Sequence, residues 1–148
     1  MQAFTIGHAA RTAGTKVQTV RYYEQIGLLP SPDRSGGNQR LYTAADIDRL
    51  GFIRHARDLG FSIEAIRELL AMADRPDMSC DEADAIAARH LAAIEARITR
   101  LGSLRAELER MLGQCARGAI ADCRVIEVLG NHDHCMAAAH PRPETAIG

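Results

Sequence analysis

Residues 17–29 read Val-Gln-Thr-Val-Arg-Tyr-Tyr-Glu-Gln-Ile-Gly-Leu-Leu, and this stretch decides how the first half of the chain folds. Its inward-facing residues Val17, Val20 and Tyr23 recur at a spacing of three, which predicts a short amphipathic helix. Gly27 stands just past the end of that pattern, where a left-handed glycine commonly closes a helix. The stretch is therefore expected to be one compact helix followed by a turn.

A second short helix is predicted immediately upstream. Thr5 is a candidate N-cap, Ile6 and Ala10 are four residues apart, and Gly14 breaks the pattern. Two short helices that are joined by a tight turn form the helix-turn-helix motif. An ordinary helical hairpin fits the same pattern, so these residues alone leave both interpretations open.

The segment that follows residue 27 indicates a wing. Residues 28–38 are dense in Pro, Gly, Ser and Asn, and residues 39–42 are short and extended enough to form a strand. Arg34 and Arg40 stand on the two arms of this loop, which suits a hairpin that lies along a DNA backbone. Two more helices are expected downstream, one capped by Thr43 and closed by Gly60, and one running from Ser62 to about Ala73. Their apolar residues, Phe52 among them, are expected to supply the core of this half.

The second half of the chain is dominated by one long amphipathic pattern. Ser79 and Glu82 form a capping box that predicts a helix with Cys80 at its first position. Apolar residues then recur every three or four positions, namely Leu91, Ile94, Ile98, Leu101, Leu104, Leu108 and Met111. A helix of about 30 residues is about 45 Å long and cannot hide such a stripe within so small a chain. We expect the stripe to pair with a second copy, so that the protein is a homodimer; packing against the N-terminal half is the alternative.

Composition and charge limit the classes of function. The 148 residues suit one domain or two small ones, and Ala, Leu, Ile, Arg and Glu predominate, as in helical proteins. No apolar run approaches the roughly 20 residues of a membrane span, which favours a cytoplasmic protein that does not enter the membrane. The net charge is −1, yet the first 57 residues carry eight basic and four acidic side chains, which suits contact with phosphate. No nucleophile–base pair or phosphate-binding glycine loop indicates an enzyme.

These motifs together resemble the MerR family of transcription regulators. The resemblance is carried by Thr5-Ile6-Gly7, Thr19-Val20-Arg21-Tyr22-Tyr23-Glu24, Gly27-Leu28-Leu29, Arg34, Asn38, Arg40, Tyr42 and Phe61-Ser62, and it covers residues 4–130. It implies a mainly α protein with a winged helix-turn-helix domain over residues 1–75 and a dimerisation helix over 76–113 in an antiparallel coiled coil. A metal-binding loop and short helix would occupy 114–130, and a flexible tail 131–148.

The resemblance also implies a partner and a set of contacts. Members of the family bind promoter DNA as homodimers, distort it when an effector binds, and thereby act on RNA polymerase. Contacts in the major groove would come from Arg21 and Tyr23, and contacts to backbone phosphates from Arg34, Arg40, Tyr42 and Arg57. Gln18 stands where several relatives have a basic residue, with Lys16 nearby, so this part of the DNA contact differs from theirs.

Three cysteines indicate a metal effector, since disulfides are rare in the cytosol. By resemblance to metal-sensing members, Cys115 and Cys123 of the loop would bind a soft metal together with Cys80 of the partner protomer. Copper and silver sensors have Ser at the position of Cys80. A third thiolate suits a divalent ion, so zinc, cadmium, lead or mercury is expected. The eight-position spacing of the loop cysteines also occurs in copper sensors, which keeps a copper(I)- or silver(I)-responsive regulator as the alternative.

The tail contains a further cluster of donors, His132, His134 and Cys135. These residues could complete the first metal site, build a second one, or be incidental donors in a flexible tail. The leading prediction is thus a metal-responsive activator of efflux or detoxification genes. Two other hypotheses are a thiol redox sensor, in which Cys115 and Cys123 pair as a disulfide, and a metal-buffering protein.

Overall fold

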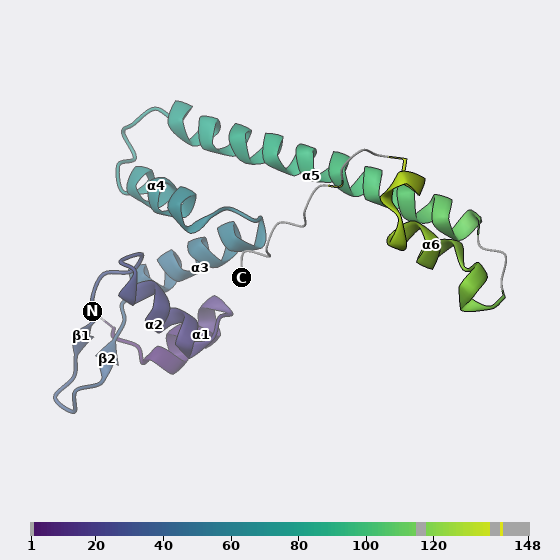
Figure 1. Cartoon of the computed structure of the whole chain (residues 1–148). Helices are drawn as coiled ribbons and strands as arrows, with labels where there is room; N and C mark the ends of the chain where they lie inside the picture. The colour runs from purple at the N-terminus through teal and green to yellow at the C-terminus, as the bar shows by residue number, and fades with distance from the viewer. Residues whose placement is uncertain (1, 115–117, 137–139, 141–148) are drawn as a thin grey trace. The chain divides into compact units, whose positions relative to one another are not determined.

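The computed structural model describes residues 2–114, 118–136 and 140 of the chain. The chain divides into two units, one up to Ile86 and one from Ala87 onward, and each is described by itself. The first unit holds four helices and a small hairpin, which are coloured from purple to teal in Figure 1. The second holds most of the longest helix, α5, and the short helices that follow it.

The helix-turn-helix prediction is confirmed almost to the residue. Helix α1 covers Ile6–Ala13, and the Thr5 hydroxyl accepts a hydrogen bond from the His8 amide at 3.3 Å. Helix α2 covers Val17–Gln25. Gly14 has a φ of 67° and turns the chain between the two helices, a conformation that only glycine adopts without strain.

The wing is a minimal antiparallel hairpin. Strand β1 is Asp33–Arg34 and strand β2 is Arg40–Leu41, with Arg34 opposite Arg40 in the register. One further bridge ties the chain start to this hairpin, because Phe4 and Tyr42 exchange two backbone hydrogen bonds of 2.8 Å. The wing is thereby fixed to the segment that leads into α1.

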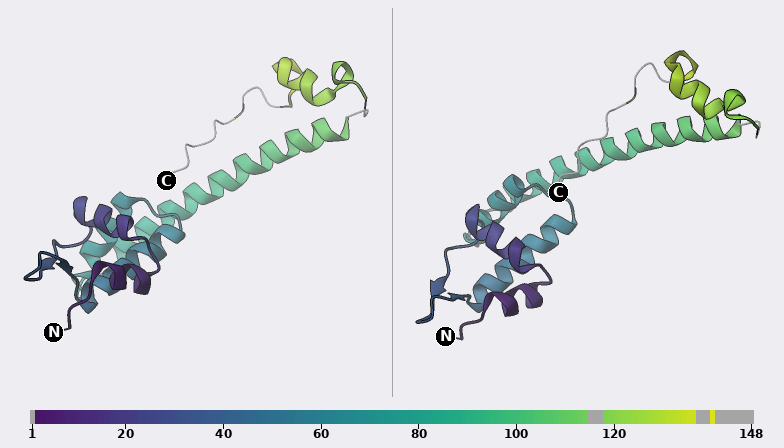
Figure 2. Two further views of the ribbon diagram at one scale, coloured as in Figure 1. Left: turned by 90° about the horizontal axis from the view of Figure 1, so that it is seen from below. Right: turned by 60° about the horizontal axis from the view of Figure 1, so that its bottom comes forward.

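Helices α3 and α4 complete the first unit. Helix α3 covers Ala44–Asp58 and begins with a capping box between Thr43 and Asp46, and α4 covers Ile63–Ala73 with Ser62 as its N-cap. Helix α1 packs against α2 and α3, and α3 packs against α4, as the views in Figure 2 also show. The core is formed by Ala9, Ala10, Ala13, Val20, Tyr23, Leu28, Leu29, Tyr42, Leu50, Ile53, Ala56, Ile66 and Leu70. Phe52, expected in this core, is 40% exposed.

The long helix α5 covers Asp81–Gly113 and is followed by η1 (Ile120–Asp122), α6 (Arg124–Gly130) and η2 (His132–His134). It begins one residue later than predicted. Cys80 is the capping residue, because its carbonyl accepts the first helical bond, from the Asp84 amide at 2.9 Å. Beyond Gly113, α6 runs back alongside the C-terminal part of α5 (Figures 1 and 2). Among the helices described, none is long and apolar enough to cross a membrane.

The apolar stripe of α5 is largely uncovered within the second unit. Four of its members are 54–64% exposed, namely Leu91, Ile98, Leu101 and Leu108. Near the end of the helix the burial changes, since Met111 is only 4% exposed and Glu107, an acidic residue, is equally enclosed. Met111 and Glu107, near the end of α5, are therefore covered by the same chain, whereas most of the stripe is not.

The turn at Gly14 provides a first prediction. Replacing Gly14 with Ala forces a left-handed backbone on a residue with a side chain, and the new methyl group meets the Arg54 guanidinium. The left-handed conformation alone costs about 1–2 kcal/mol. We expect Gly14→Ala to lower the free energy of unfolding by at least that amount in urea denaturation.

Gly51 provides the matched control. It lies inside α3, and a methyl group there meets no atom within 4 Å. Gly51→Ala should leave stability unchanged or raise it by roughly 0.5–1 kcal/mol, because alanine is the better helix former. Equal stability of the Gly14→Ala and native proteins would show that the turn does not need its present conformation.

Candidate functional site

Most of the residues predicted to face DNA lie on or next to α2 and the wing of the first unit, and Arg57 lies on α3. Lys16, Gln18 and Arg21 are exposed, and Arg34 is exposed on strand β1. Arg34 also donates a hydrogen bond of 3.1 Å to the Asn38 carbonyl, across the hairpin loop. Three cations on one helix and its neighbouring loop can attract a polyanion and make hydrogen bonds to phosphate oxygens.

Glu24 joins the wing to α2. Its carboxylate accepts a 2.6 Å hydrogen bond from the Tyr42 hydroxyl and pairs with the Arg40 guanidinium at 3.2 Å. Burial, followed by the hydrogen bond to Glu24, raises the pKa of Tyr42, so that the phenol stays protonated and keeps donating. The helix that carries Arg21 and the strand that carries Arg40 are thus held together through one carboxylate.

Three further predicted DNA contacts involve side chains that are enclosed or engaged within the unit. Tyr42 is 1% exposed and Tyr23 is 7% exposed, and burial raises the pKa of Tyr23 as well. Arg57 is half-buried and donates to the Phe61 carbonyl at 2.9 Å. DNA contact by these three residues stays a prediction. In the free chain their described partners are other parts of the same unit, which gives them a clear role in holding α2 and α3 in place.

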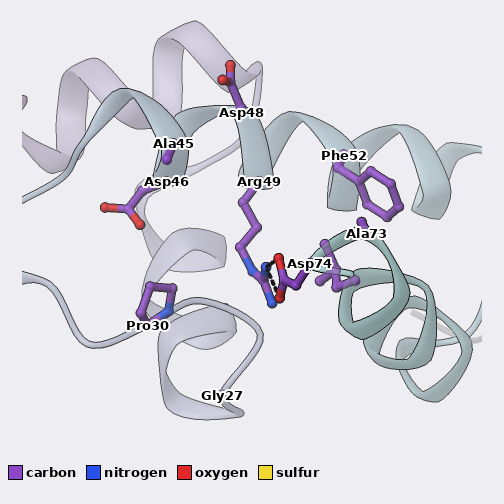
Figure 3. Close-up of a pocket in the computed structure, with 10 residues that line it drawn as sticks. Gly27, Pro30, Ala45, Asp46, Asp48, Arg49, Phe52, Ala73 and Asp74 are labelled. Carbon is purple, nitrogen blue, oxygen red and sulfur yellow. Dashed lines mark hydrogen bonds and ion pairs between the residues drawn. The ribbon is translucent and has the colours of Figure 1, made fainter. Parts of the chain in front are cut away.

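A pocket lies where the end of α2 meets α3 and α4 (Figure 3). Its central side chain is Arg49, which donates to the Leu28 carbonyl at 2.8 Å and pairs with Asp74 at 3.3 Å. Asp46, also in the lining, serves as the cap partner of Thr43. The polar groups of the pocket therefore connect three elements of the unit, and they offer no donor set for a soft metal.

The predicted metal ligands fall in different places. Cys80 is exposed in the first unit, and its thiol lies 3.9 Å from a carboxylate oxygen of Asp84. Cys123 is half-buried in the second unit and directly precedes α6. Cys115 lies outside the described residues. Neither Cys80 nor Cys123 forms a disulfide with another described residue, so each can supply a thiolate ligand.

The tail donors are arranged differently from the prediction. Ligand atoms of His132, Cys135 and His140 all lie within 4.8 Å of one another. His134 points elsewhere, because its ring nitrogen Nε2 lies 3.5 Å from a carboxylate oxygen of Glu127. His140 was not among the predicted ligands. Its donor chemistry was visible in the sequence, but its position beside residue 132 depends on how the chain turns.

Glu107 anchors this tail to α5. One carboxylate oxygen accepts a 2.7 Å hydrogen bond from Arg110, and the other accepts a 2.9 Å bond from the Met136 amide. Arg110 also donates to the His134 carbonyl. The hydrogen bond from Arg110 lowers the pKa of Glu107, whereas burial and the nearby carboxylate raise the pKa of the Cys135 thiol.

Two protein-family models match most of the chain. Residues 4–73 match the model of the MerR HTH family regulatory protein, and residues 47–111 match a model described as MerR, DNA binding. The first match contains both helices of the helix-turn-helix and the wing, and the second contains most of α5. Together the two matches cover well over half of the chain.

Individual relatives agree with these matches. The chain is 40% identical over 129 residues to the HTH-type transcriptional regulator ZntR of Escherichia coli (strain K12), covering 85% of this chain and 92% of that protein. It is 36% identical over 130 residues to the mercuric resistance operon regulatory protein of Serratia marcescens, covering 87% and 89%. The solved structure of PbrR691 from Ralstonia metallidurans CH34 in complex with lead(II) is 37% identical, with a TM-score of 0.76 and coverage of 85% and 98%. The chain belongs to the MerR family of transcription regulators.

Proposed function

We propose that the chain is a metal-responsive transcription regulator, which binds promoter DNA as a homodimer and activates efflux or detoxification genes. The effector is a divalent soft metal, namely zinc, cadmium, lead or mercury. The observation that carries the proposal is the identity to a mercuric resistance regulator and to a lead(II)-bound regulator. These two matches cover 87% and 85% of this chain, so they extend well beyond the DNA-binding half.

The parts of the chain have separate roles in this proposal. Residues 1–75 bind DNA, residues 76–113 join two protomers, residues 114–130 bind the metal, and residues 131–148 form the tail. The exposed cations on α2 and β1 support the first role, and the uncovered stripe of α5 supports the second. Apolar side chains of this size gain roughly 1.5–3 kcal/mol each when fully buried, so covering the stripe strongly favours association.

The metal would join two protomers. Cys80 caps the start of α5, whereas Cys115 and Cys123 follow its end, and an antiparallel pair of α5 helices brings opposite ends together. Three thiolates more than balance the charge of a dication, which fits zinc, cadmium, lead or mercury better than a monovalent ion. Metal binding would then change the relative orientation of the two DNA-binding domains. This would change the shape of the bound promoter and leave the affinity for the promoter nearly the same.

Transcription across a metal panel tests the sensing role. With the native protein and its own promoter region, we expect activation in vitro by one or more of zinc, cadmium, lead and mercury. Cys80→Ser should lose that divalent response by about tenfold or more, because it removes a ligand, and should still protect the promoter from footprinting reagents. The matched control is Cys135→Ser, which removes a thiol from the tail and should respond as the native protein does.

Two results would contradict the sensing proposal. One is a flat response of the native protein to all four metals. The other is an intact divalent response in Cys80→Ser. Thiol counting before and after metal addition separates metal binding from the redox alternative, since a metal sensor keeps Cys115 and Cys123 reduced, whereas a disulfide consumes both.

Association through α5 provides a separate prediction. The double variant Ile98→Glu/Leu101→Glu places two charges on the exposed stripe and should shift the protein to a monomer in sedimentation equilibrium, with the dimer weakened about a hundredfold or more. Ser103→Glu adds a charge to an exposed position on the opposite side of the helix and should remain dimeric. A monomeric native protein would rule out this interface.

Arg21 tests the DNA-binding face. Because Arg21 is exposed on α2, Arg21→Ala should weaken binding to the promoter fragment by about 1–3 kcal/mol, as measured by fluorescence anisotropy. If the contact is to a phosphate, the slope of log affinity against log salt should also fall by about one. The control is Arg105→Ala, an exposed arginine that pairs with Glu109 on α5. Equal losses in the two variants would place the DNA contact elsewhere.

A further inference from the structure

Three donor side chains gather near the end of the second unit, and none of them is one of the three proposed sensing cysteines. Ring nitrogens of His132 and His140 and the sulfur of Cys135 lie within 4.8 Å of one another, although they come from separate points of the tail. The two imidazole rings meet edge to face with centroids 4.9 Å apart. Both histidines are exposed and Cys135 is half-buried, so an ion can reach the cluster from solvent.

The spacing of the donors is close to that of a bound ion. Ligands at about 2.0–2.3 Å in a tetrahedral arrangement are separated from one another by roughly 3.3–3.8 Å. The ligand atoms of the cluster lie up to 4.8 Å apart, so these distances must shorten by about 1 Å or a little more, which rotation of the side chains can supply. His132 and Cys135 already sit at the two ends of one helical turn, joined by a 2.9 Å bond from the Cys135 amide to the His132 carbonyl.

The cluster is held on a fixed base. Glu107 binds the Met136 amide, which directly follows Cys135, and Arg110 binds the His134 carbonyl, which directly precedes it. The backbone on both sides of the cysteine is therefore attached to α5. The carboxylate of Glu107 also accepts a hydrogen bond from the Cys135 side chain. Partners of this kind orient the ligands of metal sites and limit the ordering that binding requires.

We propose that His132, Cys135 and His140 bind one zinc-class divalent ion per chain, independently of Cys80, Cys115 and Cys123. Two imidazoles and one thiolate are the donor types that zinc prefers, and three protein ligands leave a fourth position for water or another donor. The thiol releases its proton to solvent when the sulfur binds the ion. This donor set differs from three thiolates, so the two sites discriminate differently among soft metals.

His134 was one of the donors expected from the sequence, and it is not one of the three proposed ligands. It stands next to the cluster and has the same donor chemistry as His132 and His140. Its imidazole, however, lies beside the Glu127 carboxylate, 3.5 Å away, and is not part of the group. His134 is therefore the natural control, because its replacement removes one imidazole from the same segment without removing a proposed ligand.

The experiment uses the full-length chain with Cys80→Ser and Cys123→Ser, so that the sensing site cannot bind. Zinc affinity is measured by competition with a chromophoric chelator. We expect one zinc ion per chain, with affinity reduced about tenfold or more by His132→Ala and by His140→Ala, and changed less than about twofold by His134→Ala. Cobalt(II) supplies a second readout, since a thiolate ligand gives a charge-transfer band that Cys135→Ser should abolish.

Three results would overturn the proposal. The first is that the chain binds no zinc in this background. The second is that His134→Ala lowers the zinc affinity whereas His140→Ala does not. The third is that Cys135→Ser leaves the cobalt(II) spectrum unchanged. His132 and His140 are exposed and His134 is half-buried, and circular dichroism confirms that each variant is folded before titration. Because the background lacks two sensing cysteines, zinc binding here is measured separately from the transcriptional response, and either proposal can fail without the other.

Discussion

The second half of this chain is governed by an apolar stripe that its own unit does not cover. Leu91, Ile98 and Leu101 on α5 are each more than half exposed, although they recur with the spacing of a packed helix face. Burying such side chains is the main favourable contribution to association between proteins. If two α5 helices pair in an antiparallel manner, the start of one helix meets the end of the other. In the proposed dimer, the sharing of a metal between chains would then be a consequence of how this stripe becomes buried.

The first unit depends on a different kind of constraint, which is polar and local. Glu24 accepts hydrogen bonds from Tyr42 and Arg40, and this joins the second helix of the helix-turn-helix to the wing. A two-residue strand pair has too few backbone bonds to hold its own position. The wing is placed by the Phe4–Tyr42 bridge and by Glu24, so the orientation of both predicted DNA-contacting elements follows from side chains that are themselves enclosed.

The sequence predicted local features well and long-range features poorly. The caps at Thr5, Thr43 and Ser62 and the turn at Gly14 were predicted because each depends on residues within four positions of it. Phe52 was misplaced because its exposure depends on which face of α3 meets α4. The same limit applies to the tail, where the spacing suggested His134 and the fold instead brings in His140.

The anchoring of the tail also bears on how two metal sites could coexist in one chain. Arg110 and Glu107 form a pair that is enclosed at the end of α5, and an unpaired charge there would be costly, so the pair holds the segment around Cys135 in place. Cys123 lies earlier in the same unit, directly before α6. Because Glu107 and Arg110 hold the backbone around Cys135 on α5, the proposed tail site can form without Cys123. In the two proposals together, Cys123 would then remain available to the site that a second protomer completes.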